Sequence, residues 1–179
     1  VSSLSYNGGG ELATAIKPFK LMGEYIRQQP RDIVYSLCQY GMSDVWKWGD
    51  SVGGNCWRTT NDITDTWVSV KSIALDQDKS AAYAKPGNWN DPDMLVVGHV
   101  GWGNPHPSKL KPDEQYLHIS LWSLFSAPLL IGCDMEKLDD FTLNLLTNDE
   151  VIEINQDPLG KQATCKQTIG ELRIYVKEL

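Results

Sequence analysis

The sequence predicts an α/β fold built on a parallel sheet, of the kind found in (β/α) barrels. Short apolar runs alternate along the chain with longer segments of helical periodicity, which is typical of parallel strands joined by crossover helices. Clusters of polar side chains follow these runs where the chain turns into the next helix. In a (β/α) barrel the carboxyl ends of the strands share one face, and that face holds the active site.

Length and composition are those of an ordinary globular domain. The chain has 179 residues, of which 41% are hydrophobic and 22% charged, and this length suffices for a real core. The net charge of −7 argues against nucleic acid or an anionic membrane as a partner. No apolar stretch approaches the roughly 18–20 residues that a membrane-spanning helix needs. The opening VSSLSYNGGG lacks methionine and signal-peptide character, so we expect a segment of a longer protein.

Metal and cofactor sites are not indicated. The histidines are few and separated, and no CxxC pair occurs among the four cysteines, Cys38, Cys56, Cys133 and Cys165. The residues alone leave disulfides open. The acidic stretch 90–93 fails the calcium-loop spacing because position 95 is leucine.

The first half of the chain carries two helix–strand units. A helix is predicted over 17–29, with Pro18 in its first turn and Phe19, Met22 and Ile26 on one face. The nearly continuous apolar run at 31–38 then suits a strand buried on both faces. Further along, 56–62 is the second strand candidate, and helical spacing returns over 65–75.

The second half continues the alternation. The third strand region is 88–98, and a long polar loop carrying Trp102, a candidate ligand-stacking residue, leads to a helix over 111–127. Pro112 opens this helix, and its apolar stripe is predicted at Leu117, Leu121, Leu124 and Phe125. His118 is interpreted as a core histidine of that helix.

The end of the chain changes character. Residues 128–134 are the fourth strand candidate, and 139–155 read as one helix. The closing ELRIYVKEL alternates apolar and polar side chains, which is typical of a half-exposed antiparallel strand. We therefore expect one domain over 1–158 and the start of another over 159–179.

Clusters of polar side chains end the four strand regions, namely Cys38–Tyr40, Arg58 with Asp62, Asn90–Asp93, and Asp134. Three clusters from different strands are expected to converge on one pocket. Simpler roles are open for some of them. Asp62 or Asp65 could cap the following helix, and Arg58, which can only donate hydrogen bonds, suits hydroxyl oxygens of a ligand or a carboxylate such as Asp93.

Four collinear motifs carry a family resemblance. YSLCQYG, WRTTNDITDTW, WNDPDML and NDEVIEINQDPLGKQ occur in this order from about residue 30 onward, and together they resemble the α-galactosidases of glycoside hydrolase family 27. The resemblance implies a retaining glycosidase with a (β/α)8 barrel and a following antiparallel β domain. This chain would supply strands five to eight, the C-terminal half of the barrel, and the start of the β domain.

The resemblance also implies roles for individual residues. Asp62 matches the family's acid/base, while Asp65 matches a residue with no direct role at the sugar. The implied substrate-binding residues are Cys38, Tyr40, Arg58, Asp93 and Met94. The family nucleophile lies in a K-Y-D-x-C motif, and no such motif occurs in residues 1–179. We therefore expect the isolated chain to be inactive.

The chemistry explains this choice of residues. Retaining glycosidases place two carboxyl groups roughly 5–5.5 Å apart, one as nucleophile and one as acid/base. Asp62 would start protonated, and Trp57 is expected to help by excluding water from it. Cysteine and tyrosine at positions 38 and 40 are bulkier than the residues that admit an N-acetyl group, which favours galactose.

Alternatives concern the substrate and the class of protein. Family relatives act on β-L-arabinopyranosides or α-N-acetylgalactosaminides, and a noncatalytic carbohydrate-binding fragment or a metal-dependent phosphoesterase are rival classes. The long helical segments argue against a binding module, whose usual sandwich needs strands throughout. The resemblance implies a secreted, periplasmic or lysosomal-type protein without a cofactor, and leaves homo-oligomerisation open. The position of Cys56 relative to the neighbouring tryptophan differs from that in relatives that link nearby positions by a disulfide, which favours free thiols at Cys38 and Cys56.

Overall fold

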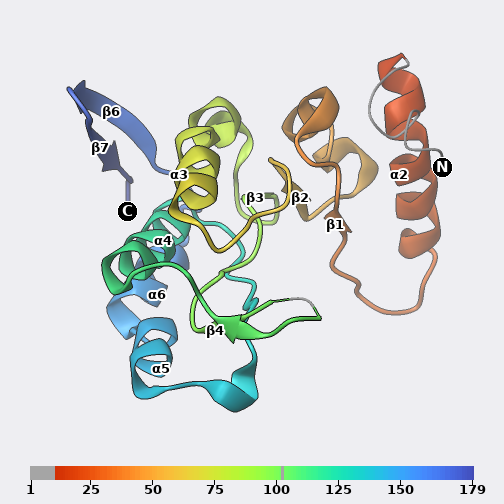
Figure 1. Cartoon of the computed structure of the whole chain (residues 1–179). Coiled ribbons are helices and arrows are strands. Elements are labelled where there is room, and N and C mark those ends of the chain that lie inside the picture. Colours follow the sequence, from red (N-terminus) through yellow and green to blue (C-terminus); the bar gives the residue numbers. More distant parts are fainter. Residues whose placement is uncertain (1–10, 102) are drawn as a thin grey trace.

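A computed structural model describes residues 11–101 and 103–179, and shows a small parallel sheet flanked by helices (Figure 1). The helix α2 lies at one end of the molecule and an antiparallel hairpin at the other. The helices are α2 (Leu12–Arg27), α3 (Trp67–Leu75), α4 (Pro112–Leu124), α5 (Asp140–Leu146) and α6 (Asp149–Asn155). The strands are β1 (Ser36–Leu37), β2 (Cys56–Arg58), β3 (Trp89–Asp91), β4 (His99–Val100), β5 (His106–Pro107), β6 (Thr164–Ile169) and β7 (Leu172–Val176).

The predicted parallel sheet is confirmed for its first three strands. They lie in the order β1-β2-β3, with Leu37 opposite Trp57 and Arg58 opposite Asp91. The fourth predicted strand is reduced to a single parallel bridge between Leu95 and Ile131. The strand order follows the chain order, so the carboxyl ends of the three strands meet at one edge.

The strand β1 differs from the prediction that both of its faces are buried. Leu37 is fully buried, whereas Val34 is 78% exposed and Ser36 is exposed. The buried face packs on the tryptophan-rich cluster of Leu37, Val45, Trp46, Trp48, Val52 and Trp57. The other face lines an apolar hollow of about 720 Å³ together with Cys56, Trp89 and Leu130. Among the described residues, therefore, only one side of the sheet is covered at β1.

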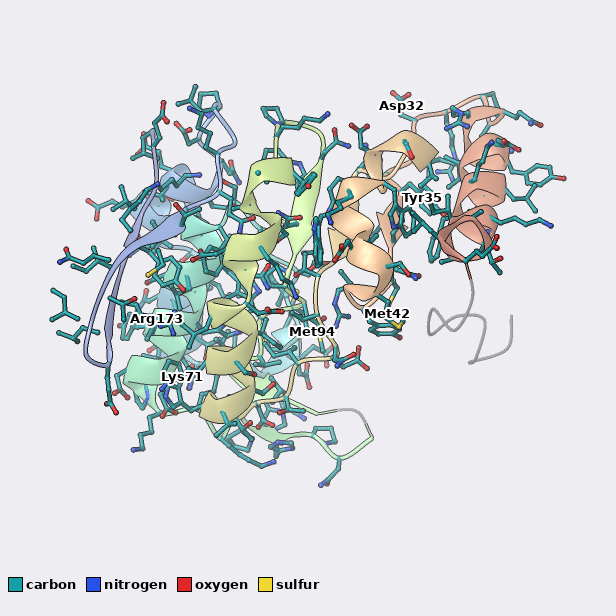
Figure 2. The ribbon with its side chains drawn as sticks, turned by 90° about the horizontal axis from the view of Figure 1, so that it is seen from above. Asp32, Tyr35, Met42, Lys71, Met94 and Arg173 are labelled. Atoms are coloured by element: carbon teal, nitrogen blue, oxygen red, sulfur yellow. The ribbon has the colours of Figure 1, made fainter. Side chains whose placement is uncertain are left out.

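The crossover from β1 to β2 contains no α-helix. Two short 3-10 segments, η1 (Met42–Lys47) and η2 (Asp50–Val52), take its place. Their tryptophans fill the cluster beneath β1 and β2, and the Trp48 indole N–H donates to the Ser43 carbonyl at 2.9 Å. Tyr35 closes the far side, because its hydroxyl donates to the Phe19 carbonyl of α2 at 3.1 Å (Figure 2).

The helix α2 begins at Leu12, so Pro18 lies inside it and not in its first turn. Phe19 packs on the tryptophan-rich cluster as predicted, but Met22 is 53% exposed. The close approach of α2 to η2 explains this orientation. A Cβ on Gly23 would lie 2.0 Å from the Val52 carbonyl oxygen, so only glycine permits the contact, and its neighbour Met22 turns outward.

The larger core lies between α3, α4 and the segment after β3. Trp122, Phe125 and Val97 are almost fully buried there, and His118 is fully buried, as predicted for a core histidine. Leu117, which we placed in the apolar stripe of α4, is 43% exposed. The buried face of α4 runs instead through His118, Ile119 and Trp122.

The C-terminal part shows one helix break and one hairpin. The single helix predicted over 139–155 is two helices, because Asn148 caps α6 by accepting from the Val151 N–H. The predicted antiparallel character of the tail is confirmed, since β6 pairs antiparallel with β7. Within residues 11–101 and 103–179, no helix has both the length and the apolar character needed to cross a membrane.

Candidate active site

The carboxyl ends of β1, β2 and β3 bring the first site residues together. Arg58 ends β2 in register with Asp91 of β3. Pairing continues past the strand ends, where the Gly41 N–H donates to the Arg58 carbonyl and the Thr59 N–H to the Asp91 carbonyl, both at 2.9 Å. The turn at Tyr40, which adopts a left-handed φ of 56°, therefore lies beside Arg58.

Arg58 is the centre of the site. One guanidinium nitrogen lies 2.8 Å from Asp93 and 3.2 Å from Asp62, and it donates to the Thr60 carbonyl at 3.2 Å. The guanidinium carbon lies 5.6 Å from the centre of the Tyr40 ring. Arg58 is only 9% exposed, and a buried cation needs such a carboxylate partner. The expected pairing of Arg58 with Asp93 is confirmed.

Asp93 links this arginine to the loop that carries Asp62. Its Oδ2 accepts from the Ile63 N–H and its Oδ1 from the Met94 N–H, each at 2.8 Å. The residue has a left-handed φ of 84°. This conformation is held by the Asp91 carboxylate, which accepts the Asp93 N–H at 2.8 Å.

Asp91 is a buried acid that the sequence did not single out as part of the binding set. It is 1% exposed. Burial raises the pKa of Asp91 to about 6, although the Asp93 N–H and the nearby Arg58 charge favour its ionised form. Asp91 thus holds the backbone of Asp93 in place through this hydrogen bond.

Asp62 stands at the surface of the site. Its side chain is 75% exposed, so the expectation that Trp57 shields it from water is wrong. Trp57 points to the other face of the sheet, where it is fully buried and donates to Asn90 Oδ1 at 2.7 Å. Asp62 does not cap α3 either, because Thr66 holds that position and accepts from the Ser69 N–H.

Asp65 likewise is no cap. It accepts from His106 and from the Lys109 N–H, each at 3.0 Å, which ties it to the β4–β5 hairpin. Burial favours the protonated acid, but the Lys109 N–H and the His106 side chain outweigh it and hold the pKa of Asp65 below its usual range.

Two of the predicted polar clusters do not join the site fully. Asn90 is buried and faces away, donating to the Ser80 carbonyl and to Gln162 Oε1. Asp134 caps the 3-10 segment η4 (Met135–Lys137) and pairs with Lys137 at 3.2 Å. Both side chains serve the fold: Asn90 is the middle residue of β3 and so faces the side opposite to Asp91, and Asp134 caps η4.

The remaining predicted residues flank the arginine. Met94 is half-buried and lies near the middle of the view in Figure 2. Its sulfur packs closely on Gly132, since a Cβ added to that glycine would lie 2.6 Å from the sulfur. Cys38 is exposed two residues before Tyr40. Cys56 carries a free thiol and is not linked to Cys38, as expected. The prediction for Trp102 lies outside the described residues.

A polar hollow of about 590 Å³ opens on one side of the Asp62 loop. Its lining includes the hydroxyl groups of Ser69 and Ser72 of α3, and also Tyr40, Thr60, Asn61 and Asp62. Arg58, Asp93 and Met94 do not line it, so the Asp62 loop separates this hollow from the arginine. Among the residues that the structure describes, no group of three or more His, Cys, Asp or Glu side chains could hold a metal ion.

Comparisons with known proteins agree on one family. Residues 2–157 match the family model described as Alpha galactosidase A. The chain is 43% identical to Alpha-galactosidase 2 of Arabidopsis thaliana over 88% of its length and 38% of the relative's. It is 41% identical to the alpha-galactosidase of Cyamopsis tetragonoloba, over 100% of this chain and 42% of that protein.

Solved structures extend the likeness to the fold. A β-L-arabinopyranosidase of glycoside hydrolase family 27 from Geobacillus stearothermophilus superimposes with a TM-score of 0.82 at 28% identity. The match covers 90% of this chain and 38% of that one. The chain thus spans about two fifths of the length of the relatives that it matches.

Proposed function

Because the chain belongs to the α-galactosidases of glycoside hydrolase family 27, we propose that it forms the acid/base half of a retaining glycosidase that releases terminal α-linked galactose. The observation that supports this most is the position of Asp62. Its exposed carboxyl group stands 3.2 Å from the buried Arg58, on a loop that Asp93 fixes through the Ile63 N–H. An exposed carboxyl group on a fixed loop can reach a leaving oxygen and transfer a proton to it.

Each residue of the site has a distinct role in this proposal. Asp62 protonates the glycosidic oxygen as the bond breaks and then deprotonates the attacking water. Arg58 donates to hydroxyl oxygens of the galactose, since a guanidinium group can only donate hydrogen bonds. Asp93 and Met94 bound the pocket, and Cys38 with Tyr40 faces the edge of the sugar at C2.

The nucleophile is proposed to come from outside residues 1–179. The printed sequence holds no K-Y-D-x-C motif, and a glycosyl-enzyme needs a second carboxylate. We propose that strands one to four of a (β/α)8 barrel carry it, with 1–158 as the second half of that barrel and 159–179 as the start of a β domain. The hollow beside β1, lined by Val34 and Ser36, is then the open interior of the barrel.

The leaving group belongs on the far side of Asp62 from Arg58. The polar hollow beside the Asp62 loop has hydroxyl groups from Ser69 and Ser72 and the ring of Tyr40, which suits a neutral sugar. We therefore propose oligosaccharides as substrates. The related β-L-arabinopyranosidase makes β-L-arabinopyranosides the second candidate, since arabinopyranose is galactose without its C6 group.

Asp62→Asn in the full-length protein tests the acid/base role. Cleavage of raffinose should fall by about 10²–10⁴ because its leaving group needs a proton. Activated p-nitrophenyl α-galactoside should lose less in its first step, and azide should restore turnover in the second. Asp50→Asn, which removes an exposed carboxylate paired with Lys85, is the matched control. Wild-type turnover of raffinose by Asp62→Asn would refute the assignment.

A mixing experiment tests the division of the barrel. Residues 1–179 alone should show no hydrolysis of p-nitrophenyl α-galactoside, and activity should return when a separately made N-terminal half is added. Activity of the isolated chain would contradict both the missing nucleophile and the half-barrel. Comparing p-nitrophenyl α-galactoside with p-nitrophenyl β-L-arabinopyranoside on the full-length protein separates the two substrate candidates.

A further inference from the structure

The loop that carries Asp62 is held in place at two points, and the proposed function assigns no role to the second one. The first is Asp93, which accepts the Ile63 N–H. The second is Asp65, three residues after Asp62, which is 8% exposed. Asp62 thus lies between one support just after β3 and another at the β4–β5 hairpin.

Asp65 holds the hairpin through three contacts with two residues. Its Oδ2 lies 3.0 Å from His106 Nε2 and 3.0 Å from the Lys109 N–H. Its Oδ1 lies 3.6 Å from the Lys109 ammonium group. We call Asp65, His106 and Lys109 the clasp. The base of the hairpin is itself fixed, because Ser108 bonds to the Gly98 and Val96 carbonyl oxygens, so the clasp joins the Asp62 loop to a well-supported segment.

The hydrogen-bond partners of His106 favour its doubly protonated form. Its Nε2 faces the Asp65 carboxylate at 3.0 Å, and its Nδ1 faces the Asn104 carbonyl oxygen at 2.8 Å. Both partners can only accept hydrogen bonds, so both ring nitrogens must donate. Only the imidazolium form carries a proton on each nitrogen, and the neutral ring must give up one of the two bonds.

We propose that the clasp positions Asp62 for proton transfer, and that it closes when His106 is doubly protonated and loosens when His106 becomes neutral. This inference rests on the proposed acid/base role of Asp62. It makes Asp65 and His106 positioning residues, which act on the reaction only through the loop. The hairpin contact is also distant in sequence, since Asp65 and His106 are 41 residues apart.

The charges around the clasp set the direction of its pH dependence. The Asn104 carbonyl and the Asp65 carboxylate raise the pKa of His106 above its usual value, while the Lys109 charge opposes them. The pKa of Asp65 is lowered. The clasp is therefore complete between the lowered pKa of Asp65 and the raised pKa of His106, and it weakens as the pH rises through the latter.

Hydrogen exchange at the Lys109 amide reports the clasp directly, because this N–H donates to Asp65. In the full-length protein its protection factor, corrected for intrinsic exchange, should fall severalfold between about pH 5.5 and 8. His106→Gln should show low protection with no such step. His106→Arg, a permanent cation, should keep high protection at both pH values, and Asp50→Asn should behave as wild type.

Kinetics on raffinose then test the positioning role. Asp65→Asn and His106→Gln should lower kcat by about tenfold with little change in KM, since substrate contacts remain while Asp62 is displaced. His106→Arg should remove the alkaline loss of kcat. A protection factor that does not change with pH, or an unchanged kcat in Asp65→Asn, would overturn the proposal. Full activity of Asp62→Asn would instead refute the proposed function, while the exchange result would stand.

Discussion

Replacing Asp93 by asparagine separates the charge of this residue from its shape. Asparagine has the same size and tolerates the left-handed φ of 84°. It replaces one carboxylate oxygen by an NH2 group, however. Because both oxygens of Asp93 accept from N–H groups, the amide must present a donor to a donor at one of them.

The magnitude follows from the burial of Arg58. This cation is 9% exposed and lies 2.8 Å from Asp93. Removing one partner of a buried pair costs about 3–5 kcal/mol. Asp62 remains 3.2 Å from the guanidinium, but its side chain is 75% exposed and therefore contributes little. We expect the free energy of unfolding to fall by about 3 kcal/mol.

Urea unfolding of the full-length protein measures this loss. The matched control is Asp50→Asn, which breaks an exposed pair with Lys85 at 2.6 Å and should cost less than about 1 kcal/mol. Adding Arg58→Met to Asp93→Asn should recover part of the loss, because no unpaired charge then stays buried. If Asp93→Asn costs no more than Asp50→Asn, the buried pair does not stabilise the site as we reason.

Three further predictions concern other positions. Burial raises the pKa of Asp91 to about 6, so the folded protein keeps a proton that the unfolded chain releases, and the free energy of unfolding should fall as the pH rises from about 4 to 6. In urea unfolding, Asp91→Asn should remove this loss, which is at most about 3 kcal/mol. Burial lowers the pKa of His118 to about 3, so the free energy of unfolding should fall as the pH drops below about 6.5. His118→Gln keeps an acceptor for the Val96 N–H and should reduce this loss at low pH, and an unchanged pH dependence would contradict the prediction. Small residues at both Cys38 and Tyr40 should raise activity on α-N-acetylgalactosaminides relative to α-galactosides, and a constant ratio would show that these side chains do not face C2.

Parts of the site follow from side-chain chemistry and could be predicted from the sequence. A guanidinium can only donate hydrogen bonds, so the pairing of Arg58 with Asp93 followed once both were placed at neighbouring strand ends. The order of strands and helices followed from periodicity, as did the burial of His118 within an apolar helix. These conclusions depend on local patterns, which the chain carries wherever it lies in space.

Contacts between distant segments could be seen only in the folded molecule. Asp65 carries the same local signal as a helix cap, but its partners lie 41 and 44 residues away on a hairpin. Trp57 could have faced either side of the sheet, and it faces the tryptophan-rich cluster, which leaves Asp62 exposed. Residue types and their spacing thus indicated which groups can donate hydrogen bonds, accept them or be buried. Which of these groups come into contact depended on how closely the backbone segments approach one another. At Gly23, for example, an added Cβ would lie 2.0 Å from the Val52 carbonyl oxygen, so there is no room for a side chain.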